Sequence, residues 1–200
     1  MTASIFTLSE NNRKNDIIKT CLRIVDEHGL KGLTVARIAQ EVGFSESALY
    51  RHFKSKAEII SMIIDATKKA AREHLSEVRK TSTNPEEDLR HLLHLNLEFL
   101  QQFPGLFRII YWDEIHIGQS ELMHKLEKLT SELLRVVVDI LKDGKKEGIF
   151  GQEVDTKTAA IHFLGIIQTA FSFWTIEHRK GSLTLLGEKL LSQFLTGVKA

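Results

Sequence analysis

Residues 34–56, with the sequence TVARIAQEVGFSESALYRHFKSK, decide the fold of this chain. Thr34 can cap a short helix, and Gly43 can end it, because glycine readily adopts the left-handed backbone of a sharp exit. Ser45 can cap a second short helix directly afterwards. Two short helices joined by a turn with glycine predict a helix-turn-helix, whose second helix fits the DNA major groove. The spacing alone is equally typical of a helical hairpin inside a bundle.

The residue types in this stretch are more specific than the spacing. The pattern T-x-x-x-I-A-x-x-x-G-x-S-x-x-x-L-Y-x-H-F-x-x-K resembles the DNA-binding signature of the tetracycline-repressor (TetR) family of transcriptional regulators. The matching positions are Thr34, Ile38, Ala39, Gly43, Ser45, Leu49, Tyr50, His52, Phe53 and Lys56. The motif extends from Ile17 to about Ile64. The rest of the chain resembles the family only in length, helical pattern and order of elements.

Composition and periodicity indicate the fold class. The chain has 200 residues, of which 42% are hydrophobic, and this is enough for a substantial core. Only Pro85 and Pro104 interrupt it, and aliphatic and charged residues recur with helical period almost throughout. We therefore expect an all-α fold, with an N-terminal three-helix helix-turn-helix domain and a C-terminal helical bundle of about five to six helices.

The polar segment around Pro85 predicts a boundary in the chain. The expected parts are a flexible arm over residues 1–10, the helix-turn-helix domain over 11–54, a connecting helix over 55–80, and a ligand-binding and dimerisation domain over 81–200. Ser55 and Glu58 predict a capping box at the start of the connecting helix. Periodicity predicts further helices over residues 12–27, 86–102, 106–115, 120–147, 155–179 and 183–196.

Charge and cysteine usage limit the class of protein. Residues 1–80 hold 14 Lys/Arg and 10 Asp/Glu, a net of +4, whereas the remaining residues have a net charge of −3. A basic N-terminal part fits an end that faces a polyanion, although solvated helix faces produce a difference of this size too. The single cysteine, Cys21, fits a reducing cytoplasm, and we expect neither a signal peptide nor a membrane span.

No motif for catalysis or metal binding stands out. The sequence contains no HExxH, GxSxG, P-loop or dinucleotide-binding glycine pattern. His91 and His94 are one helical turn apart, but no Cys/His cluster accompanies them. We therefore expect no enzyme activity, no metal and no cofactor.

The resemblance to the TetR family names the residues of a DNA contact. It implies that Thr34, Tyr50, His52 and Lys56 hold the DNA backbone. The expected base readers lie on and near the second helix: Arg37, Glu46, Ser47, Ala48 and Arg51. Arginine can bond both acceptors of guanine, and glutamate can accept from the cytosine amino group, although Glu46 is also a typical acidic residue of a helix N-terminus. The expected DNA-binding set is Thr34, Arg37, Ser45, Glu46, Ser47, Ala48, Tyr50, Arg51, His52 and Lys56.

Aromatic side chains gather in the C-terminal part, where a helical bundle also needs them as core. The family resemblance implies a small-molecule pocket there, with a few polar groups among aromatic walls. An aromatic lining with few positive charges suits a hydrophobic or weakly cationic effector. The candidate lining residues are His94, Phe99, Phe103, Phe107, Tyr111, Trp112, His116, Phe163, Gln168 and Phe171.

The last two expected helices are apolar on more than one side. Such a helix must be covered twice, once by its own core and once by another surface. The simplest second cover is the same helix pair of another copy, which gives a symmetric four-helix contact in a homodimer. The candidate interface residues are Ile161, Leu164, Phe173, Trp174, Leu186, Leu190 and Phe194.

These expectations combine into a cytoplasmic, sequence-specific DNA-binding regulator. It would bind a pseudo-palindromic operator as a homodimer and act as a repressor that a small hydrophobic effector releases. The first alternative is an architectural or nucleoid-associated DNA-binding dimer without an effector, and the second is an enzyme or small-molecule binder with a vestigial helix-turn-helix. An accessible cavity in the C-terminal part would favour the regulator, whereas a fully packed core would favour the architectural protein.

Overall fold

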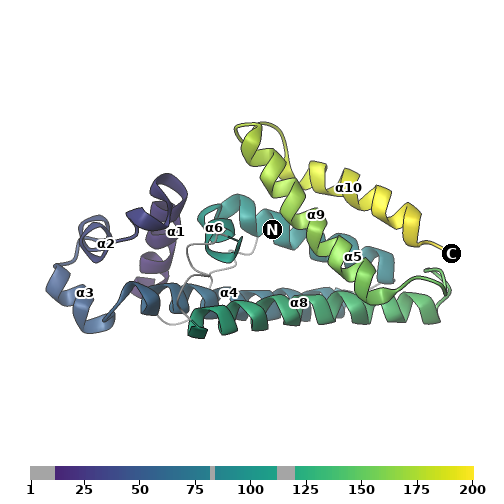
Figure 1. Cartoon of the computed structure of the whole chain (residues 1–200), viewed down its shortest axis with the longest axis horizontal. Coiled ribbons are helices and arrows are strands. Elements are labelled where there is room, and N and C mark those ends of the chain that lie inside the picture. The colour runs from purple at the N-terminus through teal and green to yellow at the C-terminus, as the bar shows by residue number, and fades with distance from the viewer. Residues whose placement is uncertain (1–11, 82–83, 112–119) are drawn as a thin grey trace. The chain divides into compact units, whose positions relative to one another are not determined.

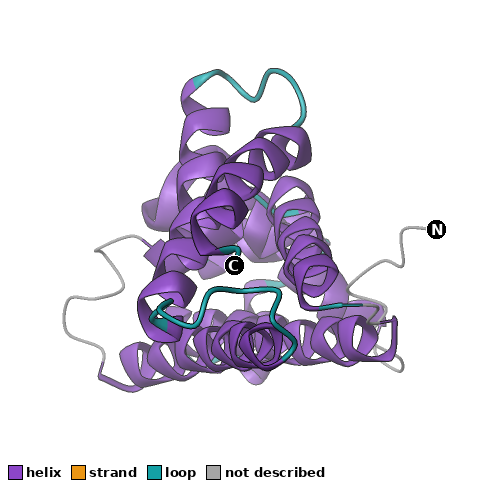
Figure 2. Cartoon of the chain, turned by 90° about the vertical axis from the view of Figure 1, so that its right-hand side faces the viewer, coloured by secondary structure: helices purple, strands orange, loops and turns teal. Residues whose placement is uncertain are grey.

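The computed structural model describes residues 12–81, 84–111 and 120–200. This part of the chain contains helices and loops but no named strand, which confirms the predicted all-α fold (Figures 1 and 2). The predicted arm over residues 1–10 and the end of the helix predicted over 106–115 lie outside the described residues. The described helices are α1 (Asn12–Gly32), α2 (Val35–Val42), α3 (Glu46–His52), α4 (Lys56–Thr81), α5 (Pro85–Gln102), α6 (Gly105–Tyr111), α8 (Ser120–Lys146), α9 (Thr156–Ile176) and α10 (Leu183–Val198).

Helix α1 contains a kink near its end. Gly29 has a left-handed φ of 67° with ψ −179°, so regular helix stops there and a short turn to Gly32 follows. The kink lies two residues after the end of the helix predicted over residues 12–27. It matters for the neighbouring elements, because the last carbonyls of a helix have no partner inside the helix and need other donors.

Side-chain caps begin the two helices that follow the helix-turn-helix. Ser55 Oγ accepts the N–H of Glu58 at 3.2 Å, which is one half of the predicted capping box. In the other half, the Glu58 carboxylate accepts the N–H of Lys54 at 2.6 Å rather than that of Ser55. Asn84 caps α5 through Oδ1, which accepts the N–H of Glu87 at 3.0 Å.

Helix α9 ends at Ile176, before the predicted end near Arg179. His178 and Arg179 both adopt a left-handed backbone, with φ of 54° and 60°. Trp174 supports this turn, since its indole N–H donates to the Gly181 carbonyl at 3.2 Å and its ring centroid lies 5.8 Å from the Arg179 guanidinium carbon. The predicted end is therefore wrong because contacts with the Trp174 side chain stabilise a turn where periodicity alone would continue the helix.

By packing, the described chain divides into two compact units. The first unit groups the residues up to Ala70 with those from Gln102 to Leu129, and the second groups Ala71–Gln101 with Thr130–Ala200. Helix α6 packs on α1 within the first unit, and α9 packs on α10 within the second. Helix α6 thus shares a compact unit with the helix-turn-helix, although it follows the sequence boundary near Pro85.

The first unit has an apolar core that includes Cys21. Ile24, Ile38, Leu49 and Ile63 are fully buried, as is Cys21 itself. Burial, and then the nearby charge of Glu41, raise the pKa of the Cys21 thiol to about 12. The thiol is therefore protonated and unreactive near neutral pH, and Cys21 packs in the core as a small hydrophobic residue.

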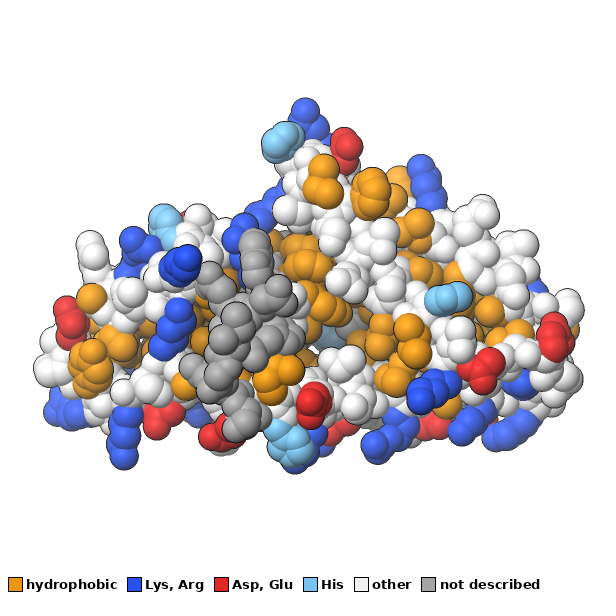
Figure 3. Space-filling view, viewed as in Figure 1, with side chains coloured by type: hydrophobic (Ala, Val, Ile, Leu, Met, Phe, Trp, Pro, Cys, Tyr) orange, Lys and Arg blue, Asp and Glu red, His pale blue; other side chains and the backbone are white. Residues whose placement is uncertain are grey.

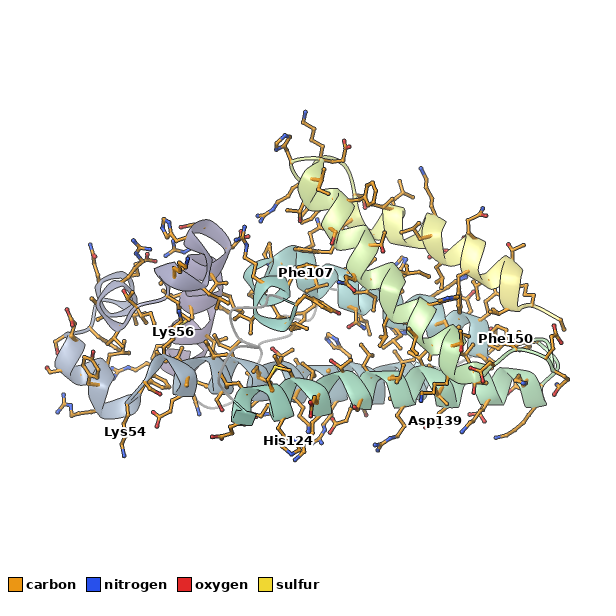
Figure 4. All side chains as sticks on the ribbon, in the orientation of Figure 1. Lys54, Lys56, Phe107, His124, Asp139 and Phe150 are labelled. Carbon is orange, nitrogen blue, oxygen red and sulfur yellow. The ribbon has the colours of Figure 1, made fainter. Side chains whose placement is uncertain are left out.

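The last residues of the chain are tied to the second unit. Lys199 forms an isolated backbone bridge with Phe150, whose ring is buried in the loop between α8 and α9 (Figure 4). The Lys199 ammonium lies 2.8 Å from Glu86. Lys199 first, and then Arg90, lower the pKa of the Glu86 carboxyl. Helix α10 is therefore held at its end by both α5 and the α8–α9 loop.

Helix α9 is strongly apolar along its length. Among the described helices, it alone has the length and the composition to cross a membrane. The mean hydropathy of its most apolar 18-residue window is 1.4. Of that window, 39% is buried inside the structure. Core helices of soluble proteins pass the same test, and a helix covered on two sides has this composition as well.

Candidate functional site

Helix α2 has a side-chain cap at its start and a glycine at its end. Thr34 Oγ1 accepts the N–H of Arg37 at 3.2 Å, with the extended backbone that is usual for a capping residue. Gly43 ends the helix with a left-handed φ of 76°, and its N–H donates to the Ala39 carbonyl. These are the roles that the sequence predicts for Thr34 and Gly43.

Helix α3 starts immediately after this turn. Ser45 Oγ accepts the N–H of Ala48 at 3.2 Å, which fixes the first turn of the helix. Leu49 is fully buried on the inner side, and Phe53 follows the helix as a buried residue. The inner side of α3 is therefore held by the core, while its opposite side is available to a partner.

The outer side of α3 carries most of the predicted DNA contacts. Glu46, Ser47 and Arg51 are exposed, and the Tyr50 side chain is 52% exposed. Ala48 is half-buried, and the His52 side chain lies outside the described part of the structure. A helix with one face held by its core and a polar, aromatic and cationic outer face has the arrangement needed to enter a DNA groove.

Two predicted DNA contacts bind carbonyls of their own chain at the end of α1. Arg37 Nη1 donates to the Gly32 carbonyl at 3.3 Å, and Arg37 is half-buried. Lys56 Nζ donates to the Leu30 carbonyl. Figure 4 shows Lys56 directed toward α1, whereas Lys54 points away from it.

The predicted pocket residues belong to both compact units. Phe103, Phe107 and Tyr111 lie in the first unit, and the ring centroids of Phe107 and Tyr111 are 4.6 Å apart. Trp112 and His116 lie outside the described residues. Five candidates lie in the second unit: His94, Phe99, Phe163, Gln168 and Phe171. Of these five residues, Gln168 is exposed and the others are buried or half-buried.

Two polar neighbours of the pocket candidates do not appear in the predicted set. His74 on α4 packs edge-on against Phe99 with a centroid distance of 6.3 Å. Glu188 on α10 lies 3.3 Å from His94 Nε2 and also pairs with Arg90. Neither contact has a local sequence signal, because each joins residues from different helices.

The predicted dimer residues differ in exposure. Ile161 and Phe173 are 53% and 57% exposed, and Leu164, Leu186 and Leu190 are half-buried. Trp174 is buried within its own chain, and the half-buried Phe194 packs against Phe163 with a centroid distance of 6.5 Å. Two further large apolar side chains, absent from the predicted set, are exposed on the same helix pair: Ile176 (67%) and Leu185 (57%).

Two family profiles match the chain over most of its length. The profile described as "Bacterial regulatory proteins, tetR family" matches residues 17–62, and "YsiA-like protein, C-terminal region" matches residues 60–197. The chain belongs to the TetR family. It is therefore a DNA-binding transcriptional regulator with a helix-turn-helix, as the motif over residues 34–56 predicts.

Relatives and solved structures agree with this TetR-family assignment. The nucleoid occlusion factor SlmA of Vibrio vulnificus (strain YJ016) is 28% identical over 160 residues, which cover 80% of this chain and 82% of SlmA. The fatty acid degradation regulator FadR of Bacillus halodurans has a TM-score of 0.79 at 23% identity, covering 94% of this chain and 97% of FadR. FadR of Bacillus subtilis, solved with stearoyl-CoA, has a TM-score of 0.76 at 22% identity, covering 91% and 97%. These two structures show the same fold as this TetR-family chain.

Lys56 provides a test of the DNA contact in this TetR-family chain. We expect Lys56→Ala to weaken binding to all DNA sequences and to reduce the slope of log K against log salt by about one unit, because one fewer counterion is released. The melting temperature should also fall, since the Leu30 carbonyl loses its Lys56 partner. Titration of labelled DNA at several salt concentrations measures the slope.

The matched control is Lys189→Ala, which removes an exposed lysine from α10. Its slope should equal that of the wild type. If Lys56→Ala lowers the melting temperature but leaves the slope unchanged, Lys56 does not contact a phosphate and acts only on α1.

Proposed function

We propose that this chain is a homodimeric repressor that reads a pseudo-palindromic operator with α3 and is released by a small hydrophobic effector. The exposed outer side of α3 carries this proposal, because the caps at Thr34 and Ser45 and the turn at Gly43 hold that helix in one orientation. The proposed contacts are the predicted DNA-binding set apart from Arg37, and they include the exposed Tyr50 and Arg51 of α3.

The homodimer is supported by the apolar surface of α9 and α10. Ile161, Phe173, Ile176 and Leu185 all expose more than half of their side chains. Apolar side chains are visible at the surface over this helix pair in Figure 3. A second copy of the same pair would cover them symmetrically, and two recognition helices would then meet two half-sites.

The effector is supported by the aromatic composition around α5 and α9. Gly165 on α9 is a position for a space-filling test, because a Cβ there would meet no atom within 4 Å. FadR of Bacillus subtilis, which shares the fold, was solved with stearoyl-CoA. We therefore choose acyl-CoA thioesters of graded chain length as the first probes for this chain.

The operator must be identified before the effector can be tested. Selection of DNA from a random-sequence library with the purified wild-type chain, followed by footprinting, should give a pseudo-palindrome that is protected on one face of the duplex over successive major grooves. Enrichment of no sequence at all would reject sequence-specific binding by this chain.

Effector binding and operator binding should oppose each other. Since coupling is reciprocal, an acyl-CoA that weakens operator binding a hundredfold must itself bind a hundredfold more weakly to the operator complex, a difference of about 2.7 kcal/mol. Thermal shift with and without operator measures both directions. Gly165→Phe should block the acyl-CoA while sparing operator affinity, if the space beside Gly165 belongs to the effector site.

The alternative is an architectural or nucleoid-associated DNA-binding dimer without an effector. The similarity to SlmA, which is named a nucleoid occlusion factor, favours this alternative. Acyl-CoAs that bind equally well with and without operator, together with many operator copies spread over the genome, would support it over the repressor.

We infer further that the protein acts in the cytoplasm and without catalytic activity, as a regulator that binds DNA. We also keep the proposed functional division of the chain into DNA binding over residues 11–54, connection over 55–80, and effector binding and dimerisation over 81–200. Within this division, α6 is the part of the effector region that packs with the helix-turn-helix in one unit.

A further inference from the structure

The last turn of α1 provides acceptors for two basic side chains. Gly29 ends the regular helix with its left-handed backbone, and the chain reaches Leu33 through a short turn. The Leu30 carbonyl accepts the N–H of Leu33 at 3.2 Å and also the Lys56 ammonium. The Gly32 carbonyl accepts the Arg37 guanidinium. Cations are favourable here because the C-terminal end of a helix carries partial negative charge.

The contact of Arg37 with this turn is closely fitted. A Cβ on residue 32 would lie 2.8 Å from Arg37 Nη1 and would overlap the side chain of His28. The guanidinium therefore lies close against the backbone of Gly32. The same arginine is also held through its backbone, since its N–H donates to Thr34 Oγ1. Two bonds thus tie the first turn of α2 to the chain just before it.

We propose that Arg37 is a positioning residue of the helix-turn-helix and reads no base. Reading guanine requires that the guanidinium presents two donors to the edge of the base. The Arg37 guanidinium instead donates to the Gly32 carbonyl at the end of α1. By joining the start of α2 to the end of α1, it sets the direction of α2, and through the Gly43 turn it sets that of α3.

Base reading then falls to residues on α3 itself. Glu46, Ser47 and Arg51 are the predicted base readers that are exposed on that helix. Arg51 is the arginine whose side chain remains in solvent, so it serves as a matched comparison for Arg37. Arg37 is thus removed from the predicted DNA contacts and supports α3 instead.

The test uses the full chain and an operator selected by the wild type from random-sequence DNA, and it rests on the DNA binding proposed above. Arg37→Ala is titrated against the operator and against copies with single base-pair changes, each at several salt concentrations. We expect affinity for every copy to fall by the same factor, about tenfold for the loss of one charge-assisted hydrogen bond, with an unchanged salt slope. The melting temperature should fall, and Arg37→Lys should recover part of both losses.

Three results would overturn the assignment. A preference that relaxes at one base pair in Arg37→Ala would make Arg37 a base reader, and a salt slope reduced by about one unit would make it a phosphate contact. No change in either affinity or melting temperature would also reject it. If Arg37→Ala fails to fold, Arg37→Lys carries the same comparison of base preference. Failure of the wild type to select any sequence would instead reject the proposed function.

The comparison variant is Arg51→Ala, which leaves the Gly32 carbonyl bonded to Arg37. Its melting temperature should match that of the wild type, because Arg51 is exposed. A fall in melting temperature equal to that of Arg37→Ala would mean that loss of any arginine in this region destabilises the chain. The positioning role of Arg37 would then be rejected.

Discussion

Replacement of Gly105 by alanine is expected to lower the free energy of unfolding of the first unit by about 3 kcal/mol or more, because over-packing against a backbone cannot be relieved by a side-chain rotation. Gly105 begins α6 and is buried. A Cβ there would overlap the Leu22 carbonyl oxygen of α1 and lie 3.0 Å from the backbone nitrogen of Asp26. Chemical denaturation followed by circular dichroism measures the loss.

The matched control is Gly197→Ala, another glycine-to-alanine change within a helix. Its Cβ would meet no atom within 4 Å, and its φ is not left-handed. We expect it to stabilise the chain by up to about 1 kcal/mol, since alanine favours helix over glycine. Equal effects of the two variants would show that the close approach of α6 to α1 does not matter for stability.

The Gly105 contact also has a consequence for regulation. Helix α6 carries Phe107 and Tyr111, two candidates for the effector pocket, and it packs directly on α1. An effector that displaces α6 would therefore act on α1 without first moving α4. If so, Gly105→Ala should weaken operator binding even without effector, to an extent that the loss of stability alone does not explain.

Local rules predict the helix-turn-helix of this chain well. The caps at Thr34 and Ser45 and the left-handed exit at Gly43 involve neighbours within four residues, so residue type and spacing are sufficient to predict them. The end of the regular part of α1 is also a local feature, because it lies at a glycine, Gly29. Such features need no knowledge of the tertiary structure.

Features that depend on distant contacts could not be predicted in this way. The close approach at Gly105 depends on the α1 backbone, some eighty positions earlier in the sequence. The predicted end of α9 near Arg179 is too late because Trp174 stabilises a turn with two left-handed residues that are not glycine. The Arg37 side chain is a further case, since its residue type fits guanine as well as it fits a backbone carbonyl.

Phe173→Glu is expected to dissociate the homodimer while the protomer stays folded. The Phe173 side chain is 57% exposed in the single chain, so a carboxylate there is solvated in the monomer. In the proposed interface the same carboxylate would be buried without a partner, which costs about 3–5 kcal/mol and weakens association by roughly a hundredfold to a thousandfold or more. Sedimentation equilibrium measures the dissociation constant, and circular dichroism checks the fold.

Phe173 is a better test position than Phe194, because a charge at Phe173 separates dissociation of the dimer from unfolding of the protomer. The Phe194 ring packs against the fully buried Phe163, so a charge at that position would also disturb the core of the protomer.

The reciprocal control is Tyr50→Glu, which places the same charge on an exposed aromatic position of α3. It should abolish operator binding by repulsion from the phosphates while the dimer persists. Operator binding should also fall sharply in Phe173→Glu, because a monomer reaches only one half-site. A wild-type monomer at micromolar concentration, or a Phe173→Glu dimer of unchanged affinity, would remove α9 from the interface and leave its exposed apolar side chains without the proposed partner.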